Sequence, residues 1–185
     1  MINRKGLSPI VATILIIMLT VGAVAMLAKF IVPFVKDNLN KGSECVNYRD
    51  YFKFVESFEF EGKELAFNCR EGGLYGAMIQ SSAEPDLGKE VAGFKIIFTG
   101  EADSANIVVK DEQKTSKKLN EGRMLNKSIT KIEIPKEGEI NTFVFNLSKD
   151  YENMEIYPIL NSGRVCEDKT DIIKIKDCET SLVVI

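Results

Sequence analysis

The sequence predicts an α+β protein in which one long apolar N-terminal helix precedes an antiparallel β-sandwich head domain. No charged residue occurs between Lys5 and Lys29, and a helix that is apolar on every side belongs in lipid or inside a bundle. From Cys45 onward, short segments that alternate between apolar and polar residues are separated by turn residues. Short strands at this spacing, with few helical patterns, are typical of a sandwich or barrel.

The N-terminal helix is expected to run from Leu7 to Lys41 and to cross a membrane. The stretch from Leu7 to Ala28 carries no charge, and about 20 apolar residues suffice to cross a bilayer core of about 30 Å. At about 1.5 Å per residue the whole helix would be about 50 Å long, so its distal part should project from the membrane. Asn40 and Gly42 are expected to end it.

Small residues on this helix form a candidate contact with a neighbouring helix. Gly22, Ala25 and Ala28 follow a three-residue spacing that we expect to place them on one face, where small side chains let helices approach closely. Small residues are also common in any membrane span, so a helix contact and the absence of any special role both stay open. Ala23-Val-Ala25 could pass as the cleavage site of a secretory signal, but the apolar part of such signals is only about 7–15 residues long.

The remainder of the chain is expected to fold as antiparallel strands. An immunoglobulin-like sandwich is the expected arrangement, with phenylalanines at alternating positions in its core. Lys110–Asn120 is polar and is expected to be a loop or a short helix. The apolar end 181–185 is expected to add a core strand, with an exposed edge that meets another subunit as the alternative. The expected strands lie within 52–60, 64–69, 74–79, 91–99, 106–109, 129–134, 142–147, 154–160 and 171–176.

Four cysteines, Cys45, Cys69, Cys166 and Cys178, are expected to form two disulfides. Their number is even and none belongs to a C-x-x-C pair, so a zinc or redox site is poorly supported. Three pairings are possible, and we expect the pairs that are local in sequence, Cys45 with Cys69 and Cys166 with Cys178. Each would close a short loop and stabilise the fold by roughly 3 kcal/mol. Four buried thiols in a cytosolic protein are the alternative.

Two N-x-[ST] sequons, at Asn126 and Asn146, are candidate glycosylation sites. Such a motif is short and often occurs by chance. Asn146 is the weaker candidate, because it lies in an expected strand and is accessible only if that position faces outward.

The composition argues against catalysis and against nucleic-acid binding. The chain has no histidine, which removes the commonest general base and the commonest metal ligand. The net charge of −3 is mild, and no block of like charge runs through the chain. The carboxylates show no calcium-loop spacing, and no phosphate-binding or nucleophile motif is present. We therefore expect no enzymatic activity, no cofactor, no metal and no nucleic-acid partner.

A short basic leader, which ends in Arg4-Lys5-Gly6, precedes the apolar run. The run begins with Leu7-Ser-Pro-Ile-Val11 and continues with further apolar residues. This start resembles that of archaeal type IV pilins and their archaellin-like relatives. The resemblance covers about the first 35 residues and implies that a prepilin peptidase cuts between Gly6 and Leu7, on the cytoplasmic side of the membrane. Bacterial pilins carry a glutamate at the fifth mature position, where this chain has Val11, and archaeal members often lack it.

The resemblance implies a division into three parts: a class III leader peptide at 1–6, a membrane and filament-core helix at 7–42, and an extracytoplasmic head at 43–185. The implied partners are the membrane, the prepilin peptidase, the pilus assembly machinery and other copies of this chain or related pilins. The chain is then expected in the cell membrane, as a single span with its head outside, and in an extracellular filament. The alternative is a minor pilin or anchored binding domain that uses the same signal only for export.

Overall fold

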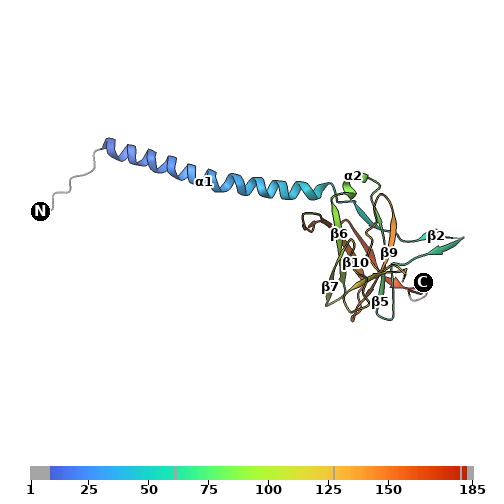
Figure 1. The fold of residues 1–185 in the computed structure, drawn as a ribbon. Helices are drawn as coiled ribbons and strands as arrows, with labels where there is room; N and C mark the ends of the chain where they lie inside the picture. The colour runs from blue at the N-terminus through green and yellow to red at the C-terminus, as the bar shows by residue number, and fades with distance from the viewer. Residues whose placement is uncertain (1–8, 61, 127, 180, 183–185) are drawn as a thin grey trace. The chain divides into compact units, whose positions relative to one another are not determined.

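A computed structural model describes residues 9–182, except for 61, 127 and 180. A long N-terminal helix is followed by mostly antiparallel sheets, which confirms the α+β class (Figure 1). The chain divides into two compact units, Met1–Glu44 and Cys45–Ile185, and the second unit is called the head below.

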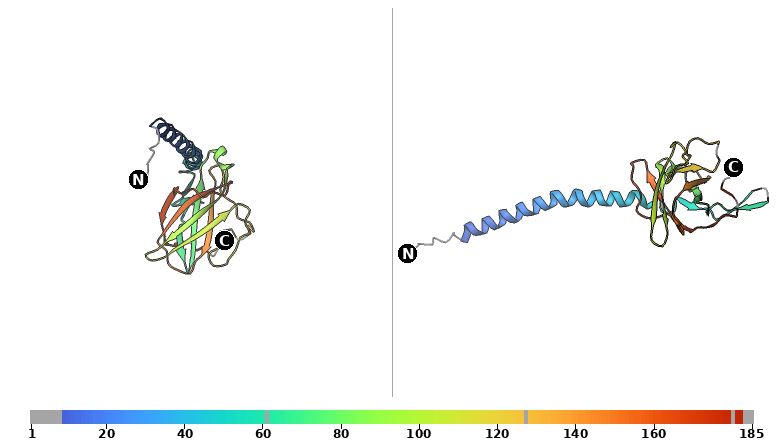
Figure 2. Two further views of the ribbon diagram at one scale, coloured as in Figure 1. Left: turned by 90° about the vertical axis from the view of Figure 1, so that its left-hand side faces the viewer. Right: turned by 90° about the horizontal axis from the view of Figure 1, so that it is seen from below.

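The helix α1 spans Pro9–Val46 and is drawn in Figure 2 as one continuous, gently curved ribbon. It was expected to end at Asn40 or Gly42, but it continues past both. Glycine inside a helix costs only about 1 kcal/mol relative to alanine, so one glycine need not end a helix. The last turn is also held by tertiary structure, because Cys45 is bonded to Cys166 of the head.

Two sheets and a separate hairpin make up the head. One sheet has the order β12-β4-β5-β9-β8, with β1 also paired to β5, and the other has the order β11-β10-β6-β7. The hairpin consists of β2 and β3, and a short helix, α2, spans Pro85–Gly88. The strands are β1 Phe52–Phe54, β2 Phe58–Phe60, β3 Lys63–Leu65, β4 Cys69–Glu71, β5 Leu74–Ser81, β6 Val91–Thr99, β7 Ser104–Lys110, β8 Gly122–Met124, β9 Ile140–Asn146, β10 Asn153–Leu160, β11 Asp171–Lys174 and β12 Lys176–Asp177.

One hydrophobic core joins the two sheets. The ring of Phe94 in β6 lies 5.0 Å from that of Phe143 in β9, and the ring of Phe98 lies 5.5 Å from that of Phe145. All four side chains are fully buried, as their alternating positions require when one face of each strand is covered. The two sheets therefore face each other as two layers, while the immunoglobulin-like strand arrangement stays a prediction.

The strand predictions hold best where alternation is long. The strand β6 has the expected bounds, whereas the strands expected at 52–60 and 64–69 are shorter and include the hairpin of β2 with β3. The strand predicted at 129–134 is wrong, because only Lys131 forms an isolated bridge there, with Lys114. Ile132 and Ile134 are nevertheless buried, and the main chain of this segment is hydrogen-bonded to residues 112–115, so the segment alternates because one of its sides packs on the core.

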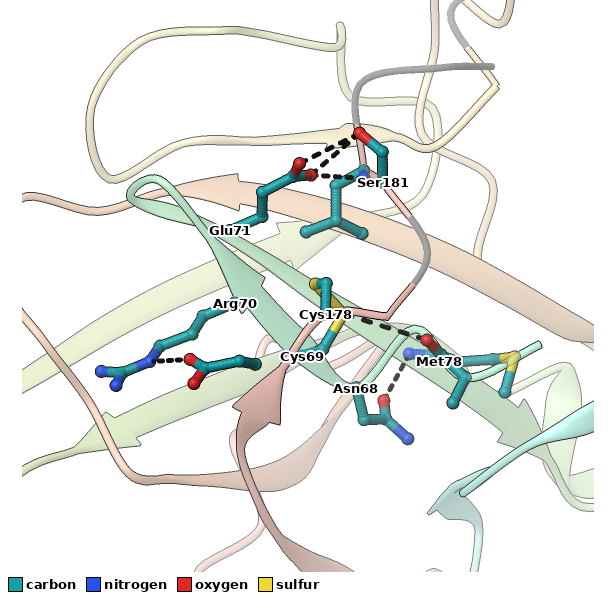
Figure 3. Close-up of a disulfide and its surroundings, with 10 residues drawn as sticks. Asn68, Cys69, Arg70, Glu71, Met78, Cys178 and Ser181 are labelled. Carbon is teal, nitrogen blue, oxygen red and sulfur yellow. Dashed lines mark hydrogen bonds and ion pairs between the residues drawn. A yellow bond between two sulfur atoms is a disulfide. The ribbon is translucent and has the colours of Figure 1, made fainter.

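The described end of the expected strand, residues 181 and 182, packs on the head and is not in a strand. Leu182 is fully buried in a second, smaller cluster with Phe67, Met78 and Val144. The Glu71 carboxylate accepts hydrogen bonds from the main-chain N–H of Leu182, at 2.8 Å, and from the Ser181 hydroxyl (Figure 3). Residues 183–185 of the predicted strand lie outside the described part of the chain.

Candidate functional site

The apolar surface of α1 is uncovered. Between Ile10 and Val35 its large apolar side chains are 44–74 % exposed. The stretch Pro9–Lys36, 28 residues long, has the length and composition to cross a membrane. Removing so much apolar surface from water is worth on the order of tens of kcal/mol, so this helix requires lipid or other helices around it.

The two threonine hydroxyls of the span are satisfied within the helix itself. The Thr13 hydroxyl donates to the carbonyl oxygen of Ile10 at 2.8 Å, and the Thr20 hydroxyl donates to that of Ile17 at 2.9 Å. An unsatisfied polar group in hydrocarbon costs several kcal/mol, so these bonds suit the helix to lipid. The first charge after Pro9 is Lys29.

The small residues Gly22, Ala25 and Ala28 all lie on exposed surface of α1. A Cβ atom built at Gly22 would meet no atom within 4 Å, so the helix surface is open there. Because each three-residue step turns the helix by about 60°, the three residues spread over about 120° and form a broad face, not a narrow seam. Their contact with a second helix stays a prediction. The expected cleavage residues Arg4, Lys5, Gly6 and Leu7 lie outside the described residues.

The expected local pairing of the cysteines is wrong. Cys45 is bonded to Cys166 and Cys69 to Cys178, across sequence separations of 121 and 109 residues. The reason lies in the sheet: β12 pairs with β4 in parallel, with Lys176 opposite Cys69, which brings Cys178 beside this strand (Figure 3).

The disulfides place restraints at both ends of the head. Cys45 opens the head and Cys178 lies near its end, and both are bonded to cysteines more than a hundred residues away. All four sulfurs are paired, and Cys166 and Cys69 are buried. Disulfides persist in oxidising compartments outside the cytoplasm, so a head with two of them belongs in such a space.

The two sequons differ in their surroundings. Asn126 is exposed, and its hydrogen bond from the main-chain N–H of Ser128, at 2.9 Å, uses Oδ1 and not the amide nitrogen. Asn146 is half-buried in β9, and its amide nitrogen donates to the carbonyl oxygen of Lys117 at 3.2 Å. Because a glycan is attached through that nitrogen, Asn126 is the better acceptor of the two.

A polar network lies on the open face of β10. Glu155 accepts hydrogen bonds from Lys169 at 2.8 Å and from the Tyr157 hydroxyl at 2.6 Å. These bonds lower the pKa of Glu155, while burial and the bond to Glu155 raise the pKa of Tyr157 to about 12. These groups form a structural network in which the lysine and the tyrosine both donate to the same carboxylate. Within the described residues, no three Cys, Asp or Glu side chains are placed to hold a metal ion.

Arg123 is a buried cation that the sequence reasoning missed. It lies in β8 with 9 % of its surface exposed, and burial lowers its pKa. Its guanidinium donates to the carbonyl oxygens of Met124, Leu125 and Leu182, at 3.1 to 3.4 Å. A signal was present, because Arg123 adjoins the apolar Met124-Leu125 pair, but the short strand β8 was not predicted.

Comparisons with known proteins add no assignment. No family model matches the sequence, and no curated protein matches it either. The features of the chain that bear on its function are the apolar helix, the disulfide-bonded head and the N-terminal residues that resemble those of archaeal pilins.

Proposed function

We propose that this chain is the structural subunit of a type IV pilus-like surface filament, cleaved between Gly6 and Leu7 and assembled through α1. The observation that carries the proposal is the uncovered apolar surface of this helix. A membrane stores such a helix, and a helix pulled out of lipid must bury the same surface against others of its kind. Repeated head-to-tail contacts that do not close on themselves then produce a helical filament.

The apolar surface extends further than an anchor requires. Beyond Lys29 the side chains continue as Phe30-Ile-Val-Pro-Phe-Val35, and Phe30 and Phe34 are 72 % and 69 % exposed. The stretch Pro9–Lys36 would measure about 42 Å as a helix, whereas a bilayer core is about 30 Å thick. A lone membrane anchor would leave part of this surface near water, whereas a bundle of identical helices would cover all of it. The extra apolar turns therefore favour a filament core over an anchored binding domain.

The implied partners and the head of the chain complete the proposal. The prepilin peptidase removes the leader, the assembly machinery extracts the helix from the membrane, and copies of this chain or related pilins form the filament. The head lies outside the cell on the filament surface, where its two disulfides are maintained. The chain itself carries out no catalysis and needs no cofactor.

The processing is tested by the intact mass and N-terminal sequence of protein from the native membrane and from sheared cell-surface material. We expect a mature start at Leu7 and protein in the sheared fraction. A start at Leu7 with protein only in the membrane would favour the anchored alternative. A start at Met1, or cleavage beyond Ala25, would contradict the pilin-like proposal.

The filament role is tested by a charge on the extra apolar turns. Phe34→Glu should leave membrane insertion intact, because the uncharged stretch before Lys29 is unchanged, but it should abolish filaments by placing a carboxylate in the bundle. Phe34→Leu is the matched control and should assemble. Normal filaments from the Phe34→Glu variant would exclude this part of α1 from the filament core.

A further inference from the structure

A hollow of about 590 Å³ lies on the head between the segment 115–118 and β8. Main-chain hydrogen bonds hold its walls, from Ser116 N–H to the Gly122 carbonyl oxygen and from Thr115 N–H to the Thr130 carbonyl oxygen, both 3.0 Å long. A volume of about 300–1,000 Å³ is usual for a site that takes a small ligand or a few units of a larger one.

Every ionisable residue that lines the hollow is a cation: Lys117, Lys118 and Arg123. The surrounding sequence is also basic, although the chain as a whole has a net charge of −3. Residues 114–131 contain six cations against the single acid Glu121, and the six are Lys114, Lys117, Lys118, Arg123, Lys127 and Lys131. Positive charge is therefore concentrated in this stretch of a mildly acidic chain.

The cations of the hollow are not neutralised by the protein around them. Across the described residues, no carboxylate forms an ion pair with Lys117, Lys118 or Arg123, whereas Lys131 nearby is paired with Glu112. The side chain of Arg123 is buried, and among the described residues its guanidinium is bonded to main-chain carbonyl oxygens. Its register opposite Val144 and its bond to Leu182 place this side chain against the second cluster, so the exposed Lys117 and Lys118 are the cations that a ligand in the hollow can reach.

The hollow also presents a hydroxyl donor. The Ser116 oxygen accepts the main-chain N–H of Lys118 at 3.2 Å, which leaves the hydroxyl hydrogen to donate to a ligand. Lysine ammoniums and a serine hydroxyl match the oxygens of carboxylate, sulfate or phosphate groups. Among the described residues that line the hollow, none is an aromatic on which a nucleobase could stack, so the lining does not favour single-stranded nucleic acid.

We propose that this hollow binds the oxyanion groups of an acidic polysaccharide outside the cell. A polymer is favoured over a single ion because Lys117 and Lys118 are exposed, and one exposed ion pair contributes only about 0–1 kcal/mol. Several such contacts along one polysaccharide chain together raise the overall binding strength well above that of a single contact. The positive charge continues past the hollow to the exposed Lys114, which gives a repeating anion a second point of contact. The proposal needs the head to be outside the cell but does not need it to be in a filament.

The test measures binding of the full chain, in detergent micelles, to immobilised heparin, polygalacturonate and neutral dextran at physiological ionic strength. The unmodified chain should bind the two acidic polymers and not dextran, and added salt should weaken the binding. Lys117→Gln/Lys118→Gln should raise the dissociation constant roughly five- to tenfold, because two charge contacts are lost. The matched control, Lys53→Gln/Lys176→Gln, removes the same charge from exposed positions elsewhere on the head and should bind nearly normally.

A second variant tests the buried cation. Arg123→Lys keeps the charge but loses the planar fork of donors to main-chain oxygens, so it should unfold at a lower temperature while heparin binding by the folded protein stays nearly unchanged. Its thermal unfolding is followed with and without heparin, so that loss of binding is not confused with loss of the fold. A variant that unfolds is discarded in favour of the lysine pair.

Four results would overturn the proposal. The first is equal weakening in the lysine pair and its control, which would show attraction by net charge alone. The second is no binding of either acidic polymer, and the third is tighter binding of a DNA oligonucleotide than of heparin. The fourth is competition by free sulfate at the same concentration of charge as heparin, which would show a site for single ions. None of these results bears on filament assembly, which is assayed separately by shearing.

Discussion

Removal of the disulfide between Cys69 and Cys178 should destabilise the head by about 4 kcal/mol. Alone, this bond would close a loop of about 109 residues, for which the chain-entropy relation gives about 4.8 kcal/mol at 25 °C. With the bond between Cys45 and Cys166 in place, the shortest path joining the two cysteines is only 24 + 12 = 36 residues, the separations of Cys45 from Cys69 and of Cys166 from Cys178. The same relation then gives about 3.8 kcal/mol.

The assay compares urea unfolding of the full chain with that of Cys69→Ala/Cys178→Ala in the same detergent, followed by the far-ultraviolet circular dichroism of the strands. Local pairs would give about 3 kcal/mol per bond, so stability alone discriminates weakly between the two pairings. A tryptic digest under non-reducing conditions decides, because trypsin cuts at Arg49, Arg70 and Lys169 separate the four cysteines.

We expect linked peptides that contain Cys45 with Cys166 and Cys69 with Cys178. A linked pair of Cys45 with Cys69 would refute the observed pairing and the parallel contact of β12 with β4. A loss of less than about 1.5 kcal/mol, with the connectivity confirmed, would refute the entropy argument but not the fold.

Three further outcomes are expected. Gly76→Ala should destabilise the head by about 3 kcal/mol or more in urea unfolding, because a Cβ there would lie 2.1 Å from the main-chain oxygen of Phe67; a loss below about 1 kcal/mol would contradict this close approach. Glu155 has a lowered pKa in the folded state, so it contributes stability at neutral pH that is lost as pH falls below about 4.5 and through the folded pKa. Glu155→Gln should therefore unfold with a shallower acid dependence than the unmodified chain, and Lys169→Gln, which removes the partner, should show the same change; unchanged acid profiles would contradict the ion pair. Intact mass of native protein should show any N-linked glycan at Asn126, removed by Asn126→Gln, and a glycan on the second sequon instead would contradict the assignment from side-chain exposure.

The sequence identified the elements whose signal is local. The apolar run before Lys29 predicts a membrane-length helix from composition alone, because a run of twenty or more apolar residues without a charge is typical of a helix that crosses a membrane. The strand β6 was predicted with its bounds from its own apolar residues. In the structure it is paired on both sides, with β10 and β7, so its whole length is kept as a strand. The end of α1 was misplaced, because glycine and asparagine only weaken a helix and the contacts of Cys45 outweigh them.

The tertiary structure decided what depends on residues far apart in the chain. Cysteine spacing is silent about pairing, and only the parallel contact of β12 with β4 brings Cys178 to Cys69. The segment 129–134 alternates like a strand yet forms a single bridge and a few main-chain hydrogen bonds with residues 112–115, because periodicity reports which side chains are buried and not whether the backbone pairs regularly. The cations Lys117, Lys118 and Arg123 look scattered in a mildly acidic sequence, and only the bonds of 115–118 to β8 and to Thr130 gather them around one hollow. Local patterns thus determine helix and strand character, whereas pairing, burial and site geometry depend on distances that the sequence does not contain.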